Sequence, residues 1–127
     1  MITHPKPEEL TEAVGRWIEE IRPQLDARNA FLARVAVNVL GVIGRELTLG
    51  PAAEQRAVDG LAGVLGHAGD FAALNAELCA RIRSGELTVE TPGLVAALQV
   101  MARDRIAIDQ PNYKAEGETT PWPAMLR

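Results

Sequence analysis

The sequence predicts an all-α fold, an antiparallel bundle of about five helices followed by an extended C-terminal tail. Apolar residues recur at helical spacing in five segments of the 127-residue chain, whereas strand-like alternation never lasts beyond a few residues. Aromatic residues make up only 4% of the chain, which argues against a β-rich fold. A chain of this length suits one ordinary core. We therefore predict a single domain over residues 1–127, with a disordered lead at 1–7, the bundle at 8–110 and the tail at 111–127.

Prolines and glycines bound the first two predicted helices. Pro7 and an acidic first turn suit the start of a helix that Pro23 stops. The next segment, residues 27–50, is apolar around most of its circumference, so we predict a buried central helix. Gly50 and Pro51 match a C-terminal glycine followed by a proline in the first turn of a new helix. We therefore expect the central helix to end there.

Three further helices complete the predicted bundle. Residues 52–65 carry an apolar face, although glycines within and just after this segment lower its helix propensity. Asp70 is a good N-cap for a fourth helix over residues 71–83. The segment ELTVET at residues 86–91 is too short and isolated to form a sheet, so we predict a loop. The fifth helix is expected to start at Pro92 and end before Pro111.

Composition and charge narrow the classes of partner. The net charge is −4 and the 13 Lys and Arg residues are scattered, so no nucleic-acid partner is expected. A single cysteine, Cys79, excludes an internal disulfide, and the polar N-terminus lacks the apolar region of an export signal. The longest apolar run, residues 35–44, is too short to cross a bilayer. These features predict a cytoplasmic protein without a membrane partner.

A polar line on the central helix is the best functional clue in the sequence. Its members follow the i, i+4, i+7, i+11 spacing that places side chains along one strip of a helix. They are Arg34, Asn38, Gly41 and Arg45. The missing side chain of Gly41 would let a neighbouring helix or a ligand approach closely. This line predicts either a structural network or a ligand site.

The fifth helix could supply partners for that line. If its apolar face is centred on Leu98, Arg105 and Asp109 point inward, and their i, i+4 spacing lets them touch. One interpretation is a semi-buried ion pair that sets the packing register. The other is a pocket between the second and fifth helices, in which Arg34, Asn38 and Arg45 receive an anion while Asp109 orients an arginine.

The residues provide no recognisable catalytic set. His4 and His67 are far apart in sequence, and with Cys79 as the only thiol no metal-ligand spacing exists. No phosphate-binding glycine loop and no nucleophile beside a base are present. We therefore expect no catalytic residue, no metal and no cofactor. This expectation favours a chain that provides a binding surface over one that acts as an enzyme.

An apolar side chain on the predicted tail suggests association. Trp122 lies between two prolines on a segment that cannot pack as a helix. It either folds back over its own domain or contacts a partner. We name Trp122 and Tyr113 as predicted interaction residues. Because symmetric pairing is the commonest assembly, a homodimer is the leading expectation.

Three blocks of sequence, ARVAVNVLGVIGREL, LNAELCARIRSG and RIAIDQPNY, occur in this order along the chain. Together they resemble a bacterial domain-of-unknown-function family, the one numbered six-two-eight-five, over about residues 7–113. Gln110 departs from the family pattern, which more often has Asn there, and Trp122 lies outside the resemblance. The family's recurrent polar positions fall on Arg34, Asn38, Arg45, Glu46, Asn75, Arg83, Asp109, Pro111 and Tyr113 of this sequence.

The resemblance implies no established activity. It implies a genomic neighbourhood shared with aminoglycoside-phosphotransferase-like proteins and acyl-CoA dehydrogenases, which makes either kind of protein a candidate partner. We therefore predict a non-catalytic accessory or interaction module. The alternative prediction, which rests on the residues, is a protein or enzyme that binds a small anionic ligand with the Arg/Asn/Asp cluster between the second and fifth helices.

Overall fold

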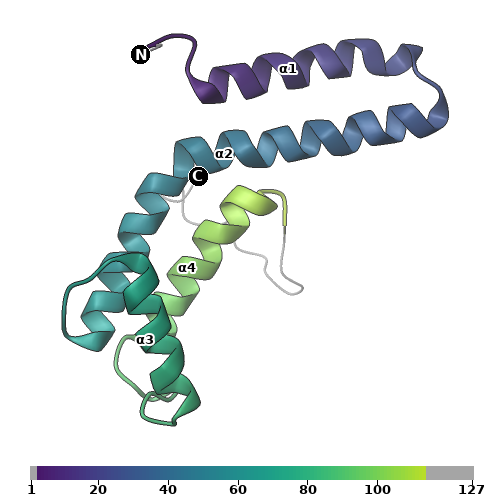
Figure 1. Ribbon diagram of the computed structural model, residues 1–127. Coiled ribbons are helices and arrows are strands. Elements are labelled where there is room, and N and C mark those ends of the chain that lie inside the picture. Colours follow the sequence, from purple (N-terminus) through teal and green to yellow (C-terminus); the bar gives the residue numbers. More distant parts are fainter. Residues whose placement is uncertain (1–2, 114–127) are drawn as a thin grey trace. The chain divides into compact units, whose positions relative to one another are not determined.

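The computed structural model describes residues 3–113 and contains no strand in this range (Figure 1). The predicted all-α class is confirmed, but four α-helices are present where about five were predicted. The helices are α1 (Pro7–Ile21), α2 (Ala27–Leu65), α3 (Phe71–Arg83) and α4 (Leu94–Asp109), and a 3-10 turn at Arg22–Gln24 joins the first two.

The predicted helix end at Gly50 and Pro51 is wrong, because α2 continues through both residues. Proline has no N–H to donate to the carbonyl four residues earlier, so one bond of the helical ladder is missing at Pro51. A helix tolerates that loss when the residues on both sides stay helical. The second and third predicted helices are therefore one helix of 39 residues.

The chain gathers into two compact units, Met1–Pro51 and Ala52–Arg127, with α2 running from one into the other. The prediction of a single domain stays a prediction. The first unit is a helical hairpin in which α1 lies alongside the first part of α2 (Figure 1). A residue without a side chain allows this approach: a β-carbon at Gly44 would lie 3.1 Å from Thr11 Oγ1. We call α1 and residues 27–51 of α2 the helical hairpin.

The second unit holds the hydrophobic core. Leu61 and Leu74 are fully buried, and Leu78 is nearly so. Helices α2 and α4 approach closely at Gly60, where a β-carbon would lie 3.3 Å from Cβ of Ala97. The buried cluster draws on the end of α2, on α3, on the following loop and on the start of α4, through Leu61, Leu65, Leu74, Leu78, Leu87 and Leu94.

Local signals set the ends of the helices in this unit. Gly66 has a φ of +82°, which ends α2 in the left-handed conformation that glycine accepts without strain. Asp70 caps α3 as predicted, because its Oδ1 accepts a bond from the Ala73 N–H at 2.8 Å. The predicted loop at residues 86–91 is confirmed, and α4 starts two residues after Pro92.

Two predictions about buried faces are wrong. The central helix was expected to be buried, yet the part of α2 in the hairpin keeps large apolar side chains exposed, among them Phe31 and Val39. An apolar circumference shows that a helix needs covering but not what covers it. On α4 the buried residues are Leu94, Ala97, Asp104 and Ile108, whereas Leu98 is exposed.

Candidate functional site

The hairpin exposes an unusual number of large apolar side chains. Trp17 is 58% exposed and Phe31 is 65% exposed, whereas a large apolar residue in a stable core is buried. Among the described residues of the first unit, only Gly15 is buried. We call these exposed side chains the hairpin face: Leu10, Val14 and Trp17 of α1, and Phe31, Leu32, Val35, Val39, Ile43 and Leu47 of α2.

The exposed apolar side chains spread around much of the hairpin. On α1 the rotation of 100° per residue places Glu12 and Arg16 on one flank of the buried Gly15, and Val14 and Trp17 on the other. On α2, Gly44 faces α1; Ile43 and Leu47 lie on one flank of Gly44, and Arg45 lies on the flank that lines the groove. Val35 points away from α1, and Phe31 lies on the same line as Asn38, seven residues later.

The polar side of the hairpin holds a groove of about 590 Å³ between α1 and α2. Four carboxylates and two guanidinium groups line it, so its charge is net negative. Such a lining repels a small anion more than it attracts one. Arg16 is already paired with Glu12 at 2.8 Å. The charged residues of the groove are Glu8, Glu9, Glu12, Arg16, Glu19 and Arg45.

The predicted polar line divides between the groove and solvent. Arg45 lines the groove, and its Nη1 lies 3.1 Å from the position that a β-carbon of Gly41 would take. The space beside Gly41 is therefore occupied by Arg45 itself. Arg34 and Asn38 are exposed on α2 and are not part of the groove lining. Asp109 belongs to the second unit, so its place in an anion site stays a prediction.

The predicted ion pair on the last helix forms, but it is not inward. Arg105 Nε lies 2.8 Å from Asp109 Oδ2, with the two side chains 61% and 41% exposed. The buried charge is instead Asp104, one position earlier. Its oxygens accept from Nε and Nη2 of Arg56 at 2.9 and 2.7 Å. This bidentate bond raises the pKa of Arg56, and α4 is turned about 100° from the predicted orientation.

The Arg56 and Asp104 pair is a structural contact between α2 and α4 within the second unit. Only 9% of the Asp104 side chain is exposed, against 43% of the Arg56 side chain. This pair was not predicted from the sequence, because Arg56 and Asp104 are 48 residues apart. Nothing in a single sequence marks such a pairing. The signal available in the sequence was the apolar face of α4. Because α4 is apolar around much of its circumference, this signal does not determine which side of the helix is buried.

The family comparison identifies the chain through α2, α3 and α4. A model of the family described as "Domain of unknown function (DUF6285)" matches residues 23–113. The chain belongs to this family. The match begins after α1, so the predicted extent of the resemblance was too long at its N-terminal end, whereas its C-terminal end at Tyr113 is confirmed. No curated protein and no solved structure matches the chain.

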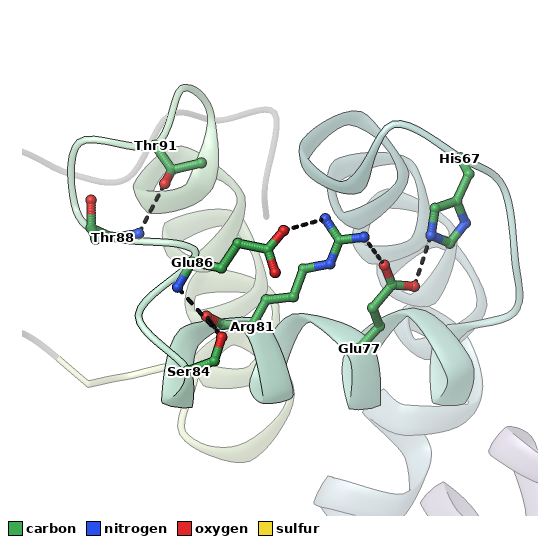
Figure 2. A network of polar contacts seen from close by, with 7 residues as sticks. All are labelled: His67, Glu77, Arg81, Ser84, Glu86, Thr88 and Thr91. Atoms are coloured by element: carbon green, nitrogen blue, oxygen red, sulfur yellow. Dashed lines mark hydrogen bonds and ion pairs between the residues drawn. The ribbon is translucent and has the colours of Figure 1, made fainter.

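A polar network in this DUF6285 member ties the end of α2 to α3 and to the loop before α4 (Figure 2). Glu77 of α3 accepts from His67 Nε2 at 2.7 Å and also pairs with Arg81. Arg81 reaches Glu86 of the loop at 3.3 Å. The Ala68 carbonyl and the Glu77 carboxylate raise the pKa of His67 above its ordinary value of 6.5. The network joins the loop to α3 through ion pairs and hydrogen bonds.

The described part of this DUF6285 chain contains few other candidates for chemistry. Over residues 3–113, no three His, Cys, Asp or Glu side chains gather where they could hold a metal ion. None of the helices described combines the length and the apolar character needed to cross a membrane. Tyr113 is 48% exposed, and its role in association stays a prediction. Trp122 lies outside the described residues.

Proposed function

We propose that this protein is a non-catalytic interaction module of the cytosol that docks another protein chain on the hairpin face. The observation that carries the proposal is the exposure of nine large apolar side chains on two adjacent helices. A soluble monomer rarely exposes a contiguous apolar patch of more than a few hundred Å². Half-exposed side chains of this size and number present a patch on the order of several hundred Å².

The packing between the two helices of the hairpin also favours a partner. Its two helices approach closely at Gly44, which has no side chain and so buries little apolar area. Helical stability in proteins comes mainly from packing an amphipathic face. The large side chains that could supply this packing point away from the contact between α1 and α2. A partner on the hairpin face would therefore stabilise the hairpin as well as bind it.

The candidate partners are a second copy of this chain and a phosphotransferase-like protein or acyl-CoA dehydrogenase. The first follows from the commonest form of assembly, and the other two from the gene neighbourhood that the family resemblance implies. The competing proposal of a small anionic ligand has less support. The groove carries more carboxylates than guanidinium groups, and Arg34 and Asn38 lie outside it.

Photo-crosslinking in the producing cell tests whether the face docks a protein. A photoreactive residue is placed at Val39, on the hairpin face, or at Thr48, which lines the groove on the same helix. Both positions are exposed, so neither change disturbs the fold. We expect a protein adduct from Val39 and none from Thr48. Equal labelling at both positions, or none at Val39, would end the proposal, whatever the adduct is.

A further inference from the structure

We propose that the occupant of the hairpin face is a second copy of this chain, packed antiparallel so that α2 lies against α2. This inference rests on the proposed function and adds the partner and its orientation. Two observations support it: the spacing of a line of apolar residues on α2, and the two charged residues at the ends of that line.

The apolar stripe of α2 has the spacing of a helix-to-helix seam. Leu32, Val35, Val39 and Val42 follow one another at intervals of three, four and three residues. This alternation keeps one line of side chains toward a partner helix, as in a coiled coil. The first three are exposed and Val42 is half-buried. The seam therefore lies open in the single chain.

A charged residue stands at each end of this seam. Arg28 is four residues before Leu32, and Glu46 is four residues after Val42. They are 18 residues apart, which is about five turns and about 27 Å, so both project from the same line of the helix. The seam thus has a positive end and a negative end.

These ends decide the orientation of a pair of identical helices. In a parallel pair Arg28 would face Arg28 of the second copy, and Glu46 would face Glu46, so like charges would meet twice. In an antiparallel pair each Arg28 faces the Glu46 of the other copy. Charged residues that border an apolar seam set orientation in this way. The charges favour a second copy that runs in the opposite direction.

The antiparallel register also matches the apolar residues. With Arg28 opposite Glu46 of the second copy, Leu32 lies opposite Val42 and Val35 lies opposite Val39. The two residue numbers of each pair have the same mean, which places the two-fold axis at the level of Val37. A two-fold interface requires this self-complementarity of one surface.

Apolar residues of α2 extend the interface on both sides of the seam. Phe31 and Ile43 flank the seam, and both are exposed. The seam points away from α1, because Val35 is nine residues before Gly44, which faces Thr11 of α1. The stripe on α1 therefore lies outside the pairing of α2 with α2.

A membrane surface is the less favoured occupant. Amphipathic helices that lie on membranes carry Lys and Arg on their polar face. The polar flank of α1 instead carries glutamates, among them Glu8, Glu12 and Glu19, which an anionic lipid surface repels.

Sedimentation of the intact chain at micromolar concentration tests the proposal with two matched variants. Val39→Glu places a charge on the seam, and Thr48→Glu places the same charge on the groove side of the same helix. We expect wild type and Thr48→Glu to be dimers and Val39→Glu to be a monomer, with equal helix content by circular dichroism. A monomeric wild type, or a dimer that Val39→Glu leaves intact, overturns the proposal.

Charge reversal tests the orientation. Arg28→Glu and Glu46→Arg each turn two attractive contacts into repulsive ones in the antiparallel dimer, and we expect each to weaken dimerisation about tenfold. The double variant restores opposite charges and should dimerise like wild type. A parallel pair would show no loss in either single variant, and that result overturns the proposal.

Two outcomes separate this proposal from the proposed function. A monomeric protein whose Val39 crosslinks to a different protein overturns the second copy but keeps the docking face. Alternatively, Trp17 fluorescence in a Trp122→Phe background could show shielding that does not depend on concentration and that vanishes on deletion of residues 114–127. That result would assign the face to the chain's own C-terminal segment and overturn both.

Discussion

At the scale of single residues, the most informative feature is a charge that the fold buries. Asp104 is almost fully enclosed, and its bidentate contact with Arg56 is the polar contact described between α2 and α4. The exposed pair of Arg105 and Asp109 lies one residue further along the same helix. Adjacent positions on one helix thus provide a buried pair and an exposed pair for comparison.

We predict that Arg56→Met destabilises the protein by about 2 kcal/mol, because it leaves a buried carboxylate without its partner. The double variant Arg56→Met with Asp104→Leu should recover part of this loss, since an apolar pair needs no hydrogen bond. Arg105→Met is the control and should change stability by less than about 1 kcal/mol, as surface ion pairs do. Chemical denaturation measures all three. Equal losses in Arg56→Met and Arg105→Met would contradict the burial of Asp104.

The network around His67 makes a second prediction, about pH. The Ala68 carbonyl and Glu77 raise the pKa of His67 above 6.5, while the nearby Arg81 opposes them. The protonated ring is therefore favoured in the folded state. Its stabilising contribution is fully present below about pH 6.5 and is lost as the pH rises through the folded-state pKa.

We expect His67→Gln to lower the melting temperature more at pH 5.5 than at pH 8.5. Glu77→Gln should reduce this pH dependence, because it removes the carboxylate that faces the ring. Thermal unfolding of the four combinations of these changes at both pH values measures the coupling. An effect of His67→Gln that is the same at both values would show that the ring does not titrate differently in the folded protein.

At the scale of elements, local chemistry predicted some boundaries and not others. The Asp70 cap, the start of α1 at Pro7 and the loop at residues 86–91 were all predicted, because a cap or a turn depends on residues within one helical turn. The helix end predicted at Gly50 and Pro51 was wrong, because the same dipeptide can occur at the end of a helix and inside one. Which one occurs depends on packing that sequence spacing does not contain.

Faces were harder to predict than boundaries. On α4, apolar residues occupy so many positions that a face centred on Leu98 and one centred on Ala97 fit almost equally, and the contact of Arg56 with Asp104 decides between them. The polar line on α2 was predicted as a site, but the apolar line beside it is the surface that lacks a partner in the single chain. Its seam spacing was visible in the sequence and was interpreted as a buried core.

Pro51 provides the prediction at this scale. A proline inside a helix removes one backbone hydrogen bond and crowds the carbonyl four residues earlier, at a cost of about 3 kcal/mol relative to alanine. Because Pro51 is exposed within α2, we expect Pro51→Ala to stabilise the protein by about 2 kcal/mol in denaturant unfolding. A loss of stability would mean that packing around residue 51 depends on the proline.

At the scale of the whole molecule, the two units differ in what holds them together. The second has a core of fully enclosed leucines, and Leu74 contributes to it with no exposed surface. The first has apolar residues but does not enclose them. Stability in the second unit is thus internal, whereas stability in the hairpin depends on what covers its face.

This difference predicts how hydrogen exchange depends on protein concentration. Local opening costs least where few apolar contacts must break, so amides of α1 should exchange faster than amides of α3 in dilute protein. Association on the hairpin face would protect α1 by mass action, so its exchange should slow as concentration rises while that of α3 stays unchanged. Val39→Glu should remove this concentration dependence, and Thr48→Glu should keep it. If α1 were as protected as α3 at every concentration, in wild type and in Val39→Glu alike, the hairpin would be stable by itself and its apolar face would need no partner.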